Sequence, residues 1–165
     1  MRINQSVEQG IYVVLMLALQ EGQAPVKSSD LSTMLEVSDS YLKKTLRKMV
    51  VGGIITSSAS KDGGFSLAKP IEQITVYDVY HAVDGGGIGI SLSGIAHHIF
   101  VDDEKLEKDE QLVLSTFEKA TSSYEEELKK LHLIDLLVEE DYVHGFVDWS
   151  KQASMKSDSH KQRRK

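Results

Sequence analysis

Residues 37–65 read VSDSYLKKTLRKMVVGGIITSSASKDGGF, and this stretch decides the fold. Ser38 favours the start of a helix, because its hydroxyl can accept a hydrogen bond from a free backbone N–H group of the first turn. The helical period runs to Val50, and four apolar side chains share one face of the helix: Leu42, Leu46, Met49 and Val50. We therefore expect a helix that packs through this face.

A second face of the same helix carries polar and cationic side chains: Ser40, Lys43, Lys44 and Arg47. Gly52 or Gly53 can end the helix, since glycine readily adopts the left-handed conformation that closes a C-terminus. A hairpin is expected next, from the β-branched residues 54–56 through a turn at residues 61–64 to a return through Phe65 and Leu67. A basic helix followed by a short hairpin is typical of the DNA-contacting part of a winged helix-turn-helix.

Two earlier segments complete this unit. Residues 4–21 have a helical period, and Ser6 with Gln9 fits a capping box at its start. Ser28 or Ser29 is expected to cap a second, short helix that turns into the basic helix at residues 36–37. Two short helices joined by a tight turn form a helix-turn-helix.

Residues 74–83, ITVYDVYHAV, predict a further helix, and the glycine-rich run DGGGIG follows at residues 84–89. A phosphate-binding loop is disfavoured, because the run follows a helix and completes neither G-x-G-x-x-G nor G-x-x-x-x-G-K-S/T. His97 and His98 stand next to Asp102, Asp103 and Glu104. Adjacent histidines point in different directions on a regular element, so we favour a solvated polar cluster over a metal site.

Residues 109–131 predict a long helix with a narrow apolar seam. Its members recur at steps of three or four residues: Val113, Phe117, Ala120, Tyr124, Leu128 and Leu131. A seam of this shape favours pairing with a partner helix over packing within its own domain, the alternative interpretation.

Residues 133–138 predict a final apolar turn, and beyond Ser150 no apolar period remains, so we expect a disordered tail. Its basic end, KQRRK at residues 161–165, could add sequence-independent attraction to DNA, although a solvated terminus is the preferred interpretation. The expected organisation is a DNA-binding domain at 1–83, a flexible glycine-rich and acidic loop at 84–108, a dimerisation helix and final turn at 109–138, and a C-terminal extension at 139–165.

The net charge of −6 is distributed unevenly over the 165 residues. Residues 1–70 carry +2, residues 71–155 carry −12 and residues 156–165 carry +4. The local field of the basic helix is therefore compatible with DNA despite the acidic total.

No apolar stretch approaches the roughly 20 residues that span a bilayer, and MRIN does not open a signal peptide, so a cytoplasmic protein without membrane contact is expected.

The order of these elements resembles the Rrf2 family of bacterial winged-helix transcription regulators, over about residues 1–138. The resemblance is carried by four segments: MRINQSVEQGIYVVLMLALQ, VSDSYLKKTLRKMVVGGII, KDGGFSLAKP and ITVYDVYHAVDG. It implies a mainly α fold with a small β-hairpin wing (α+β). It also implies a homodimer formed through the long C-terminal helix, with the third helix in the major groove and the wing in the minor groove of double-stranded DNA.

Position by position, the resemblance places Ser38, Ser40 and Tyr41 where phosphate and base contacts begin. It makes Lys43 and Lys44 the side chains that face the groove. Arg47 and Lys48 lie a turn further along the helix, where contact with phosphate is expected. In the wing, Lys61 is the only cation left, because Ala59-Ser60-Lys61 stands where family members commonly have an arginine.

Cluster-binding members of the family carry three cysteines in the loop that matches residues 85–106, whereas this chain has no cysteine at all. Disulfides, thiolate-ligated zinc and the usual iron–sulfur cluster are therefore excluded by ligand chemistry. Glu8 matches a first-helix carboxylate that serves some relatives as an extra ligand, but one carboxylate cannot hold a cluster. No cofactor is expected. The remaining alternatives for the regulatory signal are a small-molecule effector, a protein partner and the protein's own concentration.

The leading hypothesis is a homodimeric transcriptional regulator that binds an inverted-repeat DNA site. Repression is favoured over activation. The alternative is a protein-interaction module that has kept the winged-helix fold, motivated by the acidic second half and the missing wing arginine. An enzyme is disfavoured, since no motif places a catalytic set of side chains. The salt dependence of duplex binding separates the first two hypotheses, because a DNA-binding protein must release counterions.

Overall fold

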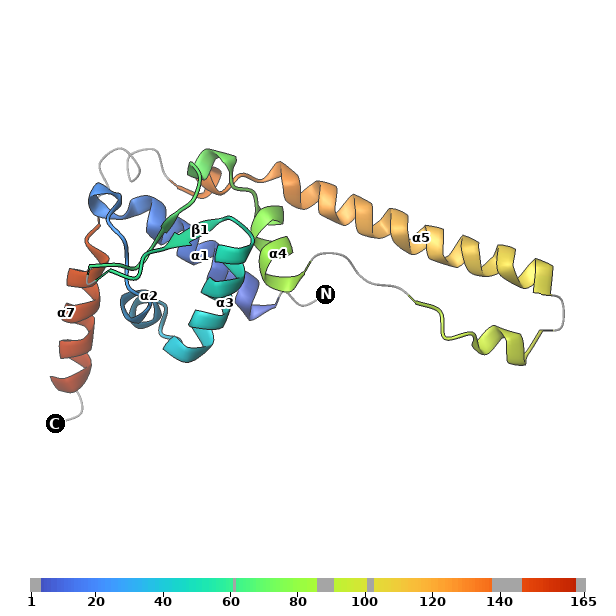
Figure 1. Cartoon of the computed structure of the whole chain (residues 1–165), viewed down its shortest axis with the longest axis horizontal. Helices are drawn as coiled ribbons and strands as arrows, with labels where there is room; N and C mark the ends of the chain where they lie inside the picture. Colours follow the sequence, from blue (N-terminus) through green and yellow to red (C-terminus); the bar gives the residue numbers. More distant parts are fainter. Residues whose placement is uncertain (1–3, 61, 86–90, 101–102, 138–146, 163–165) are drawn as a thin grey trace.

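The computed structural model describes residues 4–60, 62–85, 91–100, 103–137 and 147–162. In chain order the elements, with 3-10 helices written η, are α1 (Gln5–Leu19), η1 (Glu21–Gln23), α2 (Ser28–Leu35), α3 (Asp39–Val51), β1 (Ile55–Ser57), β2 (Phe65–Leu67), η2 (Ile71–Gln73), α4 (Val76–Asp84), η3 (Ile95–His98), α5 (Asp103–Lys130), η4 (Leu133–Leu136) and α7 (Trp149–Gln162). β1 and β2 pair antiparallel, with Ile55 opposite Leu67. The predicted mainly helical fold with a hairpin wing is confirmed (Figure 1).

Helices α1 to α4 and the base of the wing enclose the core of the domain. The apolar stripe predicted on α3 is buried, since Leu42, Leu46 and Met49 are fully covered and Val50 is half-buried. Burial of each such side chain contributes roughly 1.5–3 kcal/mol relative to exposure. This packing fixes α3 in the domain and determines which of its faces remains open to solvent.

The ends of α1, α2 and α3 differ from the predicted caps. Asn4 caps α1 by accepting a hydrogen bond from Ser6 N at 3.1 Å, so the predicted Ser6–Gln9 capping box is wrong. Lys27 rather than a serine occupies the N-cap of α2, and no side chain caps that helix. Ser38 does occupy the N-cap of α3, but its hydroxyl bonds the Ser40 hydroxyl and not a backbone N–H group.

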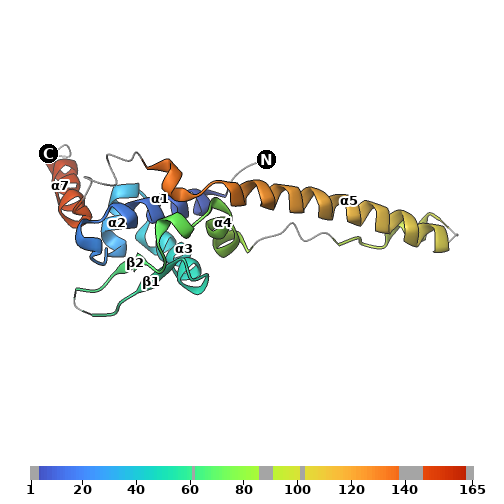
Figure 2. The ribbon, with the colours of Figure 1, turned by 90° about the horizontal axis from the view of Figure 1, so that it is seen from above.

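Helix α5 projects away from the domain as a long rod, and the segment of residues 91–100 lies alongside its outer end (Figures 1 and 2). It begins at Asp103, six residues before the predicted start at residue 109. The first turns of α5 have a packing contact of their own, because Leu106 is buried close to the segment that carries η3. Part of the predicted flexible loop is therefore helix.

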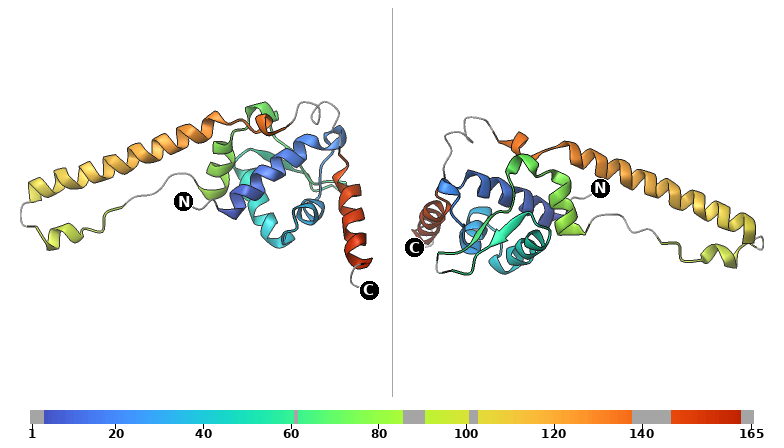
Figure 3. Two further views of the ribbon diagram at one scale, coloured as in Figure 1. Left: turned by 180° about the vertical axis from the view of Figure 1, so that it is seen from behind. Right: turned by 45° about the horizontal axis from the view of Figure 1, so that its top comes forward.

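Residues 149–162 form a helix, which corrects the predicted disordered tail over this range. Helix α7 packs along α2, and Ala153 is only 4% exposed in this contact. Trp149 anchors its start by donating from Nε1 to Met16 O at 2.6 Å. The contact is held by one small apolar side chain and several hydrogen bonds, and therefore leaves no apolar period in the sequence. The left view of Figure 3 shows α7 at the edge of the domain.

Candidate nucleic-acid interface

The exposed face of α3 carries the polar and cationic side chains that the sequence predicted there. Ser40, Lys43, Lys44 and Arg47 are all exposed, while Leu42 and Leu46 on the opposite face are buried. The folded helix thus presents its cationic side chains on a surface that points away from the core. Such a surface can pair with the phosphates and base edges of a duplex.

A hollow of about 350 Å³ lies where α2, α3 and the wing meet. Its walls come from the start of α2, the first turn of α3 and the wing, through Lys27, Ser28, Ser29, Asp39, Lys43, Ser58, Ser60, Gly63, Gly64 and Phe65. Helix N-termini and lysine side chains both favour a phosphate. Lys27, Ser28 and Ser29 were not predicted as contacts, and the signal that could have found them is the helix start at Ser28.

An ion pair within this hollow engages one of the predicted groove-facing lysines. Lys43 Nζ lies 2.7 Å from Asp39 Oδ2, one helical turn away. Hydrogen bonds, first from Lys43 and then from Ser28, hold the pKa of Asp39 below its ordinary value. Because both side chains are more than a third exposed, the pair adds little stability, and the lysine can exchange its carboxylate for a phosphate.

Two predicted contacts, Tyr41 and Lys48, are engaged with other helices of the same domain. The Tyr41 hydroxyl shares a hydrogen bond of 2.8 Å with the Ser6 hydroxyl, at the start of α1. Lys48 Nζ donates to Val83 O at 2.6 Å and so satisfies a carbonyl near the end of α4. The structure therefore groups Ser40, Lys43, Lys44 and Arg47 and separates Lys48 from them. Lys61 lies outside the described residues.

The predicted seam on α5 has two parts. Val113, Phe117, Ala120 and Leu131 are exposed, and Phe117 is 51% exposed, whereas Tyr124 and Leu128 are half-buried. Tyr124 stacks edge-on against Tyr80 of α4, with ring centroids 5.6 Å apart. Further apolar side chains at the outer end were not predicted as part of this surface: Leu92, Ile95, Ile99, Phe100 and Leu112.

Among the described residues, the histidine pair does not belong to a cluster that could bind a metal ion. His97 and His98 lie on η3 with their side chains exposed. Among the described residues no group of three or more His, Cys, Asp or Glu side chains could hold a metal ion. Asp102, one of the neighbouring carboxylates in the sequence, is outside those residues.

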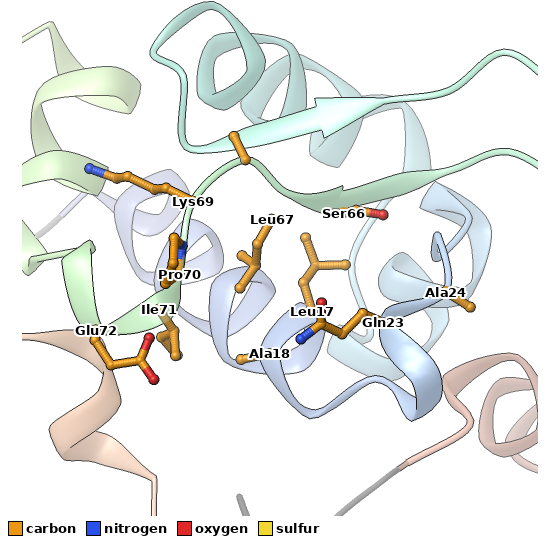
Figure 4. A pocket seen from close by; sticks show the side chains of 11 residues that line it. Leu17, Ala18, Gln23, Ala24, Ser66, Leu67, Lys69, Pro70, Ile71 and Glu72 are labelled. Atoms are coloured by element: carbon orange, nitrogen blue, oxygen red, sulfur yellow. The ribbon is translucent and has the colours of Figure 1, made fainter.

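A cavity of about 420 Å³ lies between the C-terminal half of α1 and the chain that leaves the wing (Figure 4). Leu17, Ala18 and Leu67 form its apolar part, with Gln23 at one end and Glu72 at the other. A small molecule bound there would contact β2 and α1 together.

None of the helices within the described ranges is long and apolar enough to cross a membrane.

Comparison with known proteins identifies the family that this chain matches. The profile of the Rrf2 family, described as an iron-dependent transcriptional regulator, matches residues 3–139. Protein YwgB of Bacillus subtilis, named as an HTH-type transcriptional regulator, is 33% identical over 149 residues, which cover 90% of this chain and 94% of the relative. Protein YffB of Lactococcus lactis, which carries the same kind of name, is 30% identical over 150 residues, 90% of this chain and 96% of the relative.

Solved structures share the fold. CymR, the global cysteine regulator of B. subtilis, superposes with a TM-score of 0.58 at 20% identity, over 82% of this chain and 95% of that chain. A transcriptional regulator from Lactobacillus plantarum gives a TM-score of 0.59 at 17% identity, over 97% of this chain and 98% of that chain.

The iron dependence in the family description does not fit this chain, since it has no cysteine and so no thiolate to ligate an iron–sulfur cluster. The family consists of transcriptional regulators and not of enzymes. The extent of the match to the family profile and to full-length relatives shows that the chain belongs to the Rrf2 family of helix-turn-helix transcriptional regulators.

Proposed function

We propose that this protein is a cytoplasmic, homodimeric, sequence-specific DNA-binding repressor that works without an iron–sulfur cluster. The observation that carries the proposal is the exposed cationic face of α3, which meets the start of α2 and the wing at a common hollow. In a winged helix-turn-helix this face enters the major groove, and the flanking elements contact the backbone. YwgB and YffB carry names of the same functional class.

The homodimer is supported by the exposed apolar surface at the outer half of α5. Val113 and Phe117 lie there together with Ile95, Ile99 and Phe100, and all five are largely exposed in the single chain. Contiguous apolar patches of this kind mark interaction surfaces in soluble proteins. A two-fold pairing of α5 helices would cover the patch on both chains at once.

Two-fold symmetry has a direct consequence for the DNA site. Two copies of α3 related by a dyad contact an inverted repeat whose half-sites lie about 34–36 Å apart, or a multiple of that distance. A dimer that only occupies such a site represses by excluding other proteins, and it needs no further contact surface. Repression is therefore the simplest outcome of the proposed assembly.

The test combines selection with salt titration. Full-length protein is used to select duplexes from a random pool, and the affinity for the best duplex is measured between 50 and 300 mM salt. We expect an inverted repeat and a steep linear fall of log K with log salt, because each phosphate contact releases counterions. A repressor also lowers expression from a promoter that contains the selected site, whereas an activator raises it.

The rival function, a protein-interaction module, is favoured by one observation. Residues 71–155 carry a net charge of −12, which repels nucleic acid and suits a basic protein partner. Selection that enriches no sequence, together with duplex binding that does not respond to salt, would favour this rival.

A further inference from the structure

Strand β2 has two edges, and both take part in main-chain pairing. Successive residues of an antiparallel strand turn their N–H and C=O groups alternately to one edge and to the other. Ala68 N donates to Ile54 O at 3.0 Å, so the even-numbered residues of the returning strand bond β1, whereas Phe65 and Leu67 face the outer edge. Phe65 pairs there with Val26, through one hydrogen bond in each direction.

Leu67 is the next residue on this outer edge, and its main-chain N–H and C=O have no hydrogen-bond partner within the described part of the chain. A continued ladder would pair it with Ala24. That residue is turned away, because Ala24 N donates to Glu21 O at 3.2 Å and the preceding Gln23 has a φ of 51°. Leu67 and Ala24 instead face each other across the cavity of about 420 Å³ between α1 and the wing.

The cavity offers an apolar wall beside this open strand edge. Leu17 and Ala18 of α1 lie opposite the Leu67 side chain, and Gln23 lies at the end next to Leu17 (Figure 4). Sites for small molecules combine such a wall with a few fixed polar groups, and their volumes are roughly 300–1,000 Å³. The cavity therefore has the size and the composition of a small-molecule site.

The charged side chains of the lining are at the other end of the cavity. Lys69 and Glu72 lie away from Gln23 in Figure 4, and Lys69 Nζ is 3.4 Å from Asp78 Oδ2. The end that contains Leu67 and Gln23 is lined by uncharged residues. A charged ligand would lose hydration there without gaining a counterion, so this end favours an uncharged one.

We infer that the cavity binds an uncharged ring compound that carries a hydrogen-bond donor and an acceptor side by side, as a lactam or a nucleobase does. Its acceptor takes the N–H of Leu67 and its donor bonds the C=O of Leu67, while the ring lies against Leu17 and Ala18. The ligand thus occupies the place of the missing strand partner.

Such a ligand would act on the wing. Leu67 is two residues from Phe65, which pairs with Val26 just before α2, and the start of α2 shares the hollow beside α3 with the wing. A ligand that joins β2 to α1 holds the wing in place before DNA binds, so less ordering is left to the complex and the duplex is bound more tightly. This effect rests on the proposed DNA-binding function, whereas ligand binding itself does not.

The first test titrates full-length protein, labelled with ¹⁵N at leucine, with 2-quinolinone, a lactam whose N–H and C=O are adjacent. The amide proton of Leu67 should shift downfield and saturate, because it gains an acceptor. N-methyl-2-quinolinone keeps the rings but has no donor, and should bind roughly tenfold more weakly, since it leaves the C=O of Leu67 unpaired. No saturable shift with 2-quinolinone, or equal affinity for both compounds, would overturn the site.

Variants locate the binding in the cavity. Ala24→Trp fills the cavity from an exposed position of its lining and should abolish the saturable shift. Ala59→Trp, at an exposed alanine of the wing outside the lining, is the matched control and should bind 2-quinolinone as the wild type does. If Ala24→Trp does not fold by circular dichroism, Ala18→Leu narrows the same cavity from α1. A folded variant that binds with wild-type affinity would overturn the placement.

The second test measures duplex affinity of the wild type with and without saturating 2-quinolinone. We expect an increase of roughly fivefold or more, and none for Ala24→Trp. Unchanged duplex affinity of a wild type that binds 2-quinolinone would overturn the action on the wing. Wild-type protein that binds no duplex at low salt would overturn the proposed function, while the first test still decides the ligand site.

Discussion

Lys44 and Arg47 stand on the same exposed face of α3, but they lie at different distances from its N-terminal end. Lys44 is nearer the end where side chains reach base edges, and lysine donates well to guanine O6 and N7. Lys44→Ala should therefore weaken binding to the preferred site by about 1–3 kcal/mol and relax the preference at one base pair.

Arg47→Ala should weaken all sequences alike and lower the salt slope by about one unit, because its expected partner is a phosphate. Titrations of both variants on the selected site and on an unrelated duplex distinguish the two roles. Identical effects on the two duplexes for both variants would show that neither side chain contacts a base.

Asp39 restrains the neighbouring Lys43, and its removal should strengthen DNA binding. Asp39→Asn abolishes the ion pair of 2.7 Å and also removes a negative charge from the hollow between α2, α3 and the wing. We expect higher duplex affinity and a slightly lower melting temperature, since an acidic residue in the first turn of a helix is stabilising. Affinity that falls instead would mean that Asp39 contacts DNA itself, as an acceptor for cytosine.

The same pair also makes a small contribution to the pH dependence of stability. The pKa of Asp39 is lowered in the folded state, so the carboxylate favours folding at neutral pH. That contribution is lost only as the pH falls through the lowered pKa, below the ordinary value of 3.8. Asp39→Asn should therefore leave the melting temperature less dependent on pH below about 4 than that of the wild type.

At the scale of elements, the base of the wing is joined to the segment before α2 by main-chain hydrogen bonds. Phe65 N donates to Val26 O at 2.8 Å, and Val26 N donates to Phe65 O at 2.9 Å. A Cβ atom at Gly64 would lie only 2.5 Å from Val26 O, and this main-chain atom cannot move aside without breaking the pairing.

Gly64→Ala should therefore displace the wing, destabilise the fold by roughly 1–3 kcal/mol and reduce DNA affinity. Thermal unfolding and duplex titration measure the two effects. Asp62→Ala, at an exposed position of the same turn, is the control for stability and should leave the melting temperature almost unchanged. Unchanged stability of Gly64→Ala would show that the wing accommodates a side chain at its base.

Local patterns in the sequence predicted some elements and missed others for physical reasons. The stripe of Leu42, Leu46 and Met49 was predictable, because burial of one helix face imposes a period on the sequence. Helix α7 was missed, because its contact with α2 depends on Ala153 and on hydrogen bonds that impose no apolar period.

The candidate site shows the same limit of local patterns. The cationic face of α3 was predictable from spacing alone. The hydrogen bonds that join Tyr41 and Lys48 to other helices of the domain were not. Each of these residues bonds a group 35 positions away in the sequence, Ser6 and Val83 respectively, so no local window contains both partners. The start of α2 joined the site for a related reason, since only the folded chain brings it beside the wing.

At the scale of the whole molecule, the proposed homodimer would cover the exposed apolar side chains of α5 with a second copy. Val113 and Phe117 are exposed in the single chain, so charging them should not disturb its core. Each buried apolar side chain is worth roughly 1.5–3 kcal/mol, and a two-fold interface contains every residue twice. Val113→Glu with Phe117→Glu should weaken the dimer by on the order of 10⁴-fold or more.

Sedimentation velocity measures this loss, with wild type expected at the mass of two chains and the variant at the mass of one. Ser115→Glu with Ser122→Glu adds the same charge to the opposite face of α5 and should leave the dimer intact. The monomeric variant should also lose its preference for the inverted repeat over a single half-site, because only a dimer links two copies of α3. A folded Val113→Glu, Phe117→Glu variant that keeps the mass of two chains would place the dimer interface elsewhere than on this seam.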